Sequence, residues 1–124
     1  MDIFELAELP IEIKQGSTLV LPIYYQDKNK DVIDLSQYTA KLMVRDTPES
    51  TGEPDIVLTT ENGGIEITGT SGLIIIKFLS AETIGLDENY SGTWDLWLIP
   101  SASTAFALIG GTFKVIPSTT RPIS

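Results

Sequence analysis

The sequence predicts an all-β protein, an immunoglobulin-like antiparallel β-sandwich of about seven to nine short strands with one short helical turn. Three observations support this fold class. Apolar and polar residues alternate with a period of two through most of the chain, as on the two faces of a strand. Turn-forming residues separate these runs at intervals of roughly 8 to 12 residues. Helical periodicity is nearly absent beyond residues 1–9, which excludes parallel α/β folds.

The length of 124 residues suits one domain with a continuous core. We expect an N-terminal extension over residues 1–9, the β-sandwich over residues 10–117 and an extended C-terminal tail over residues 118–124. The tail is rich in Ser and Thr and shows no apolar alternation, so it is expected to be a loose end or an arm that docks on a neighbour.

The first expected strand contains Ile11 and Ile13, which alternate with charged residues. After a break at residues 15–17, a second strand places four side chains on one face, namely Leu19, Leu21, Ile23 and Tyr25. Pro22 lies within this second strand and has no backbone N–H. The strand is therefore expected at a sheet edge or at a bulge.

A third strand has alternating faces: Ala40, Leu42 and Val44 point to the core, and Lys41, Met43 and Arg45 point to solvent. Residues 47–54 contain two prolines and a glycine and are expected to form a loop. Residues 55–60 and 65–68 are two short strands. The Asn62-Gly63 pair between them tolerates the positive φ angles of a tight hairpin turn.

Residues 73–79 form a nearly continuous apolar run, which indicates either burial on both faces or a position in the sandwich core. Residues 80–86 are expected to form one helical turn, with Ser80 as its N-cap and Gly85 at its end. The chain then returns through residues 90–99 and ends in a strand that reaches Val115. Gly110 and Gly111 predict a bulge or bend within that last strand.

The charge and composition exclude several classes of function. The net charge is −9, and the eight Lys and Arg residues are spread along the chain, so we expect no binding to nucleic acid or anionic membranes. The chain has no Cys and no His, which removes thiolate chemistry, the usual proton shuttle near neutral pH and the commonest transition-metal ligand. No cofactor is expected.

The sequence also bears on the cellular location. Its apolar runs, such as Leu73 to Ile76, are far shorter than the roughly 20 residues of a membrane-spanning helix. Its N-terminus begins Met1-Asp2-Ile3-Phe4-Glu5 and has no basic segment ahead of an apolar one, so no secretory signal is predicted. We therefore expect synthesis in the cytoplasm.

A calcium site is the first candidate for chemistry. Asp27, Asn29 and Asp31 match the first three side-chain ligand positions of a calcium-binding loop. The match fails at the sixth position, which is Val32 instead of Gly, and at the twelfth, which is Tyr38 instead of Glu. A solvated turn explains the same residues, and no metal site is predicted.

A glycoside hydrolase would need two carboxylates in one cleft, and seventeen acids leave many combinations open. Candidates are Asp95, Asp87 and Glu88. Asp95 alternates with Trp94, Leu96 and the other apolar residues of its strand, so it is expected on the outer face, near a cross-strand Lys. We predict no catalytic residues.

The residue of greatest interest is Trp97. Trp94 and Trp97 are three positions apart, so in a regular strand they point to opposite faces, and the neighbours of Trp94 assign it to the core. Trp97 then shares the outer face with Asp95 and Ile99. A large exposed aromatic side chain suits a protein interface or a sugar-binding platform. We favour an interface, either between subunits or with Phe4 and its apolar neighbours Ile3 and Leu6.

Six segments carry a family resemblance, in order along the chain and within about residues 11–121. They are Gln15-Gly16-Ser17-Thr18, Asp34 to Arg45, Thr59 to Ile65, Ser80-Ala81-Glu82-Thr83, Tyr90 to Leu96, and Gly110 to Val115. In this combination the chain resembles small β-sandwich proteins encoded among the virion genes of tailed phages and prophages. It is also similar to the N-terminal domain of phage baseplate upper proteins.

The resemblance implies a non-enzymatic structural or adaptor protein of the tail, baseplate or head surface. Its partners would be other virion proteins and identical copies, and its location would be the virion, assembled in the host cytoplasm. Two features depart from the family pattern: the segment Met1 to Leu9, and Trp97 where a polar outward residue is expected. The alternative function is a carbohydrate-binding or host-adhesion module, and a hydrolase that uses two carboxylates is a third hypothesis.

Overall fold

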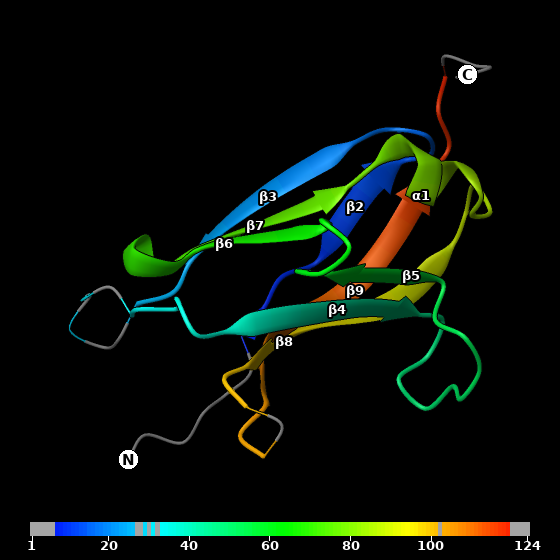
Figure 1. Cartoon of the computed structure of the whole chain (residues 1–124). Helices are drawn as coiled ribbons and strands as arrows, with labels where there is room; N and C mark the ends of the chain where they lie inside the picture. Colours follow the sequence, from blue (N-terminus) through cyan, green and yellow to red (C-terminus); the bar gives the residue numbers. More distant parts are fainter. Residues whose placement is uncertain (1–6, 27–28, 30, 32, 102, 120–124) are drawn as a thin grey trace.

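The chain forms two β-sheets packed face to face, as Figure 1 shows for this computed structural model. The structure describes residues 7–26, 29, 31, 33–101 and 103–119. Its strands are β1 (Ala7–Glu8), β2 (Ile11–Lys14), β3 (Leu19–Tyr24), β4 (Thr39–Arg45), β5 (Ile56–Thr59), β6 (Ile65–Thr68), β7 (Leu73–Phe78), β8 (Ser91–Ile99) and β9 (Phe106–Ile116). A 3-10 turn, η1 (Gly69–Ser71), and a helical turn, α1 (Ser80–Ile84), complete the described elements. The predicted all-β sandwich is confirmed.

The larger sheet has six strands. Its order is β1-β9-β8-β4-β5, and β2 also pairs with β9. The β9–β8, β8–β4 and β4–β5 pairs are antiparallel, but β1 and β2 both run parallel to β9. The sandwich is therefore antiparallel except at the edge where the beginning of the described chain meets its last strand.

The smaller sheet has three antiparallel strands in the order β3-β7-β6. Its central strand, β7, buries Ile74, Ile76 and Phe78 on the inner face, while Leu73 and Ile75 remain half-buried on the outer face. Of the two predicted arrangements for this apolar run, the structure shows a strand in the sandwich core, not one buried on both faces.

The core consists of the inward side chains of both sheets. The Phe78 ring from β7 lies 5.3 Å from the Phe113 ring of β9, centroid to centroid, and joins the two layers. Trp94 is 3% exposed, and its indole N–H donates a hydrogen bond of 3.0 Å to the Leu9 carbonyl oxygen. The bond satisfies a buried donor and fixes the short link between β1 and β2 to β8.

Pro22 lies in β3, an edge strand of the smaller sheet, as predicted. It pairs with Ile75 of β7. A residue of β3 whose nitrogen faces β7 donates its N–H to that strand. Proline has no N–H to donate, so the nitrogen of Pro22 must face the free edge of the sheet. The free edge of β3 therefore lacks a donor at its centre, which hinders the addition of another strand.

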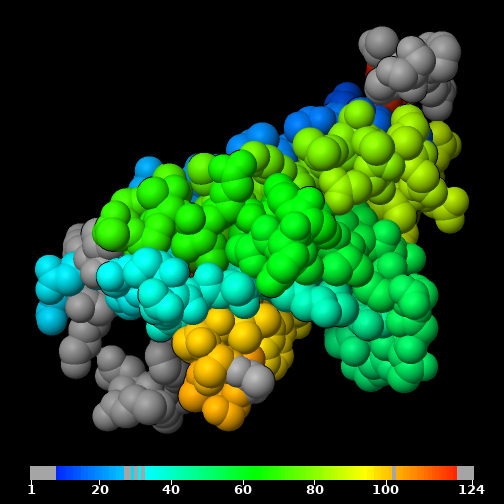
Figure 2. Space-filling model, in the orientation of Figure 1, coloured from blue at the N-terminus to red at the C-terminus, as the bar shows by residue number. Residues whose placement is uncertain are grey.

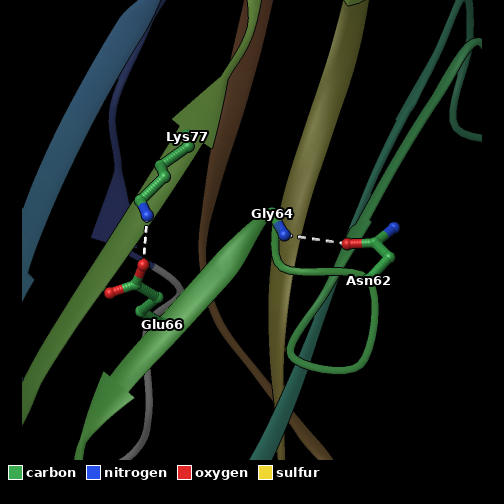
Figure 3. A network of polar contacts seen from close by, with 4 residues as sticks. All are labelled: Asn62, Gly64, Glu66 and Lys77. Atoms are coloured by element: carbon green, nitrogen blue, oxygen red, sulfur yellow. Dashed lines mark hydrogen bonds and ion pairs between the residues drawn. The ribbon is translucent and has the colours of Figure 1, made fainter.

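The Asn62-Gly63 turn forms, but the predicted hairpin is wrong. Its two flanking strands belong to different sheets, since β5 pairs with β4 and β6 pairs with β7. Gly63 has a φ of 83°, and the Asn62 side-chain oxygen accepts hydrogen bonds of 2.9 Å from the N–H groups of Thr59 and Gly64. Figure 3 shows the bond to Gly64. The turn thus carries the chain from one sheet to the other.

The helical turn α1 forms as predicted and stops before Gly85, but the predicted Ser80 cap is wrong. The N-cap position is Leu79, and the Glu82 carboxylate accepts a 2.7 Å hydrogen bond from the Leu79 N–H. The Ser80 N–H instead donates to the Thr18 hydroxyl oxygen at 3.1 Å. The carboxylate of Glu82, three residues after Leu79, therefore accepts the hydrogen bond at the start of the helical turn.

The predicted bulge at Gly110 and Gly111 is also misplaced. The β8–β9 pairing shifts between Leu96 and Trp97, so that Leu108 is the residue without a partner. The two glycines have a different role, because a Cβ atom on Gly111 would lie 2.6 Å from the Leu9 carbonyl oxygen, and one on Gly110 would lie 2.7 Å from the Trp94 carbonyl oxygen. They allow neighbouring backbone to approach closely.

Candidate protein-interaction face

The candidate site is the outer face of the six-stranded sheet, which we call the groove face. Alternation along β4 and β8 sends every second side chain to this face, because the residues between them are buried in the core. Cross-strand pairing then places Lys41 opposite Trp97 and Met43 opposite Asp95. The strand register, not the sequence spacing, brings these four side chains together.

A groove of 260 Å³ lies among these side chains. Its lining residues are Lys41, Met43, Asp95, Trp97 and Ile99. Trp97 is 41% exposed, which is high for a large aromatic side chain in the middle of a sheet. Met43 and Ile99 are half-buried beside it. The groove therefore combines an apolar surface with one cation, Lys41, and one acid, Asp95.

A second hollow of 380 Å³ adjoins the groove and shares Met43 and Asp95 with it. Arg45 and Pro48 line its other end. The Arg45 guanidinium donates hydrogen bonds to the carbonyl oxygens of Ser50 at 3.3 Å and Gly52 at 2.6 Å. Arg45 therefore holds the loop between β4 and β5 in place at the end of the groove face.

Two loops project beyond the groove face. Figures 1 and 2 show the loop between β4 and β5, in green, and the loop between β8 and β9, in orange, extending in the same direction, away from the three-stranded sheet. The floor between them is the outer surface of β4 and β8. Because β4 and β8 are antiparallel, the two loops leave opposite ends of the groove face.

Asp95 lies in the middle of the groove face. Partial burial raises the pKa of its carboxyl group, while the neighbouring Trp97 side chain and the Arg45 charge act in the opposite direction and lower it. The residue opposite it on β4 is Met43, and the expected cross-strand Lys lies one pair further on, opposite Trp97. The carboxylate is thus partly desolvated within the groove.

The structure brings three of the four predicted interface residues together, since Trp97, Asp95 and Ile99 line one groove. The fourth, Phe4, lies outside the described residues. Sequence reasoning placed Lys41 and Met43 on a solvent-facing side but did not join them to Trp97. The missing information was the pairing of β4 with β8, which no local pattern in the sequence provides.

The other candidates lie elsewhere. Asp27 is outside the described residues, while Asn29 and Asp31 are exposed in the segment between β3 and β4. Asp87 and Glu88 are exposed in the turn before β8. Within the described part of the chain, Asp95 is the one carboxylate that lines either hollow, and no three acids are grouped as metal ligands. Among the same residues, no helix is long and apolar enough to cross a membrane.

Comparison with known proteins supports the fold. No family model and no curated protein matches the chain. A solved structure of a chicken TCR is similar, with a TM-score of 0.56 at 10% sequence identity. The match covers 94% of this chain and 57% of that chain, so this chain spans less than two thirds of its length. At this identity the likeness concerns the fold alone, and the predicted immunoglobulin-like sandwich is confirmed.

Proposed function

We propose that this chain is a non-enzymatic structural or adaptor protein of a tailed-phage particle and acts through protein–protein contacts. The resemblance of residues 11–121 to small β-sandwich virion proteins supports the phage context. Its position would be the tail, the baseplate or the head surface, and its partners would be other virion proteins.

The observation that carries the proposal is the groove around Trp97. Burying the exposed part of a tryptophan against a partner contributes apolar contact at little entropic cost, and Trp is among the residues that contribute most to binding energy in interfaces. Met43 and Ile99 extend the apolar surface, and Lys41 and Asp95 line the same groove with one cation and one acid. Apolar contact area combined with a few polar groups is typical of a protein interface.

The composition supports a non-enzymatic role. The sequence has no His or Cys, and the groove places a single carboxylate, Asp95, in contact with its interior. General acid and base catalysis by carboxylates would require a second one on the opposite side of the substrate. The groove is better suited to binding than to proton transfer.

The experiment that tests the proposal is the protein inventory of purified particles. Particles induced from the source of the sequence and purified on a density gradient should contain the chain at a fixed ratio to the main virion proteins. Trp97→Ala should reduce its incorporation by about tenfold, as expected for removal of a central interface residue. Thr112→Ala, an exposed change on the same face outside the groove, should be incorporated normally. Particles that lack the chain would end the proposal.

A second candidate function is a carbohydrate-binding or host-adhesion module. The specific observation in its favour is that an exposed indole ring stands beside the carboxylate of Asp95 and the ammonium of Lys41, a platform with hydrogen-bonding groups at its side. A glycan array and titration of tryptophan emission with its hits would test it. If neither the glycan array nor the emission titration shows binding and the chain is still incorporated into particles, the structural role stands and the carbohydrate-binding role is excluded.

A further inference from the structure

The turn that carries the chain from the six-stranded sheet to the three-stranded sheet is held by one side chain, Asn62. We call residues 60–64 the crossing turn. The side-chain oxygen of Asn62 accepts hydrogen bonds from the N–H groups of Thr59 and Gly64, each at 2.9 Å. Its side-chain nitrogen donates to the Val57 carbonyl oxygen at 3.1 Å. Both ends of the amide group are therefore bound.

These bonds connect the edge strands of the two sheets. Val57 and Thr59 belong to β5, whereas Gly64 directly precedes β6. The Gly64 carbonyl oxygen in turn accepts a hydrogen bond of 2.9 Å from the Lys77 N–H of β7. Figure 3 shows the Asn62 side chain pointing across the turn to Gly64. Asn62 thus fixes the start of β6 to β5.

The residue after Asn62 makes this amide group chemically vulnerable. Asparagine is one of the thermolabile residues, because the backbone nitrogen of the next residue can attack its side-chain carbonyl carbon. A Cβ atom on that next residue hinders the attack, and glycine has none. Of the three asparagines in the chain, Asn62 alone precedes a glycine. The other two, Asn29 and Asn89, precede residues with large side chains.

We propose that Asn62 is a modification site at which the chain deamidates by its own chemistry, and that the crossing turn controls the rate. The Gly63 nitrogen loses its proton to hydroxide and forms a bond to the side-chain carbon of Asn62. The former amide nitrogen takes up a proton from water and leaves as ammonia, so a cyclic succinimide results. Water then opens the ring at either carbonyl group, which gives aspartate or isoaspartate. Asn62 and Gly63 line neither hollow of the groove face, so the site is independent of the proposed function.

The folded turn holds Asn62 in an unreactive arrangement. Attack on a carbonyl carbon comes from above the plane of the amide group, so the side chain must rotate to present that face to the Gly63 nitrogen. Hydrogen bonds at both ends of the amide group fix its plane, and the Asn62 N–H is held by a 2.9 Å bond to the Thr59 hydroxyl oxygen. Asn62 and Gly63 are both exposed, so burial gives no protection. The reaction therefore requires the hydrogen bonds of the turn to open.

Neither product can make the same contacts. An aspartate in place of Asn62 has no N–H to donate and sets a carboxylate oxygen against the Val57 carbonyl oxygen. Isoaspartate adds a methylene group to the backbone and shortens the side chain, so the acceptor moves away from the N–H groups of Thr59 and Gly64. Loss of these bonds loosens the link between the two sheets. Deamidation of Asn62 therefore destabilises the chain in which it occurs.

The first test compares the folded and the unfolded full chain. Both are incubated at pH 8, one in buffer and one in concentrated guanidinium chloride, and the peptide that contains Asn62 is followed by mass spectrometry. The signal is the mass gained when –OH replaces –NH2. Deamidation of Asn62 should be at least about tenfold faster in the unfolded chain, because three hydrogen bonds no longer have to open. In the unfolded chain Asn62 should also react much faster than Asn29 and Asn89, and Gly63→Ala should remove this difference.

Thr59→Ala tests whether the turn controls the rate. It removes the hydroxyl group that accepts the Asn62 N–H but leaves the reacting pair unchanged. The folded variant should deamidate about three- to tenfold faster than folded wild type, the effect of one hydrogen bond, and at the wild-type rate when unfolded. Thr60→Ala is the matched control, because the Thr60 hydroxyl group bonds to the Ala40 N–H and to Glu61 instead. It should react like wild type.

Asn62→Asp represents one product directly. It should unfold at a lower urea concentration than wild type, because the donor to Val57 is lost. Asn89→Asp is the matched control, since Asn89 is also exposed and also follows a glutamate. It should unfold at the wild-type urea concentration.

Several results overturn the inference. If Asn62 stays intact in the unfolded chain, it is not a modification site. Equal rates in the folded and unfolded chains show that the turn gives no protection. A faster rate in the folded chain shows that the two N–H donors on the side-chain oxygen promote the attack by stabilising negative charge. A folded Thr59→Ala that reacts at the wild-type rate shows that opening of the turn does not limit the reaction. Each readout is independent of whether the chain is found in phage particles, so this inference and the proposed function can fail separately.

Discussion

The hydroxyl group of Tyr90 donates a hydrogen bond of 2.5 Å to the carboxylate of Asp55. Tyr90 directly precedes β8, and Asp55 directly precedes β5, so the bond connects two segments that are 35 residues apart. The Tyr90 ring also meets the buried Phe113 ring edge-on, with 6.3 Å between centroids. In many immunoglobulin-like domains a tyrosine near the start of a strand donates a hydrogen bond from its hydroxyl group to the backbone a few residues upstream. Here the partner is a carboxylate at the start of another strand.

Tyr90→Phe should lower the free energy of unfolding by about 0.5–1 kcal/mol near neutral pH, because it removes this hydrogen bond but keeps the ring. Urea unfolding measures the change. Asp55→Asn keeps an acceptor for the hydroxyl proton and should cost less. Equal losses in both variants would contradict the assignment of the effect to the hydrogen bond.

The same pair predicts a dependence on alkaline pH. Burial, followed by the hydrogen bond to Asp55, raises the pKa of Tyr90 above its ordinary value of 10.0. The unfolded chain therefore loses this proton at a lower pH than the folded chain, and stability falls as the pH rises above about 10. The difference in unfolding free energy between wild type and Tyr90→Phe should shrink in that range. A constant difference from pH 8 to pH 11 would count against it.

Asp95→Asn should stabilise the fold near neutral pH. Partial burial raises the pKa of Asp95, so the folded state favours the protonated form of its carboxyl group. The free energy of unfolding therefore falls as the pH rises from the ordinary pKa of a carboxyl group to the raised pKa in the folded state. The variant removes that penalty at pH 7 but has little effect near pH 3, where wild type is protonated as well. The urea unfolding midpoints of wild type and Asp95→Asn at pH 7 and at about pH 3 measure this difference in stability. A variant that is less stable at pH 7 would show that the carboxylate is stabilised by its neighbours.

Gly111→Ala should destabilise the fold by about 1–3 kcal/mol, the range for overpacked positions. The added methyl group would lie 2.6 Å from the Leu9 carbonyl oxygen, so the link between β1 and β2 would have to move away from β9. Thermal unfolding measures the loss. Gly52→Ala is the matched control, because nothing lies within 4 Å of its Cβ position, and it should leave the melting temperature unchanged or slightly higher.

Pro22→Val should increase irreversible aggregation through the edge of β3. The substitution restores an N–H at the centre of that edge and keeps an apolar side chain, which makes the strand a better template for another chain. Thioflavin T fluorescence and light scattering during prolonged incubation would follow it. Pro22→Lys restores the same N–H but adds a charge, and it should aggregate no faster than wild type. Equal rates for all three chains would show that Pro22 does not protect the edge.

The sequence by itself determined the fold class and the face on which most strand residues lie. Alternation is a local property with a period of two, so it separated Trp94 in the core from Trp97 on the surface without any knowledge of the partner strands. It also limited the strand that contains Pro22 to a sheet edge or a bulge, because proline lacks a donor that an interior strand requires. These inferences needed only the chemistry of each residue and its immediate neighbours.

The tertiary structure alone decided which strands share a sheet, and with it the composition of the groove. Alternation is the same whichever strand lies alongside, so it did not reveal that β5 and β6 lie in different sheets or that β1 and β2 run parallel to β9. Nor did it place Lys41 and Met43 against Trp97 and Asp95. Strand pairing depends on contacts between residues far apart in the chain. Burial of a common core by these contacts outweighs the local conformational preference of each strand.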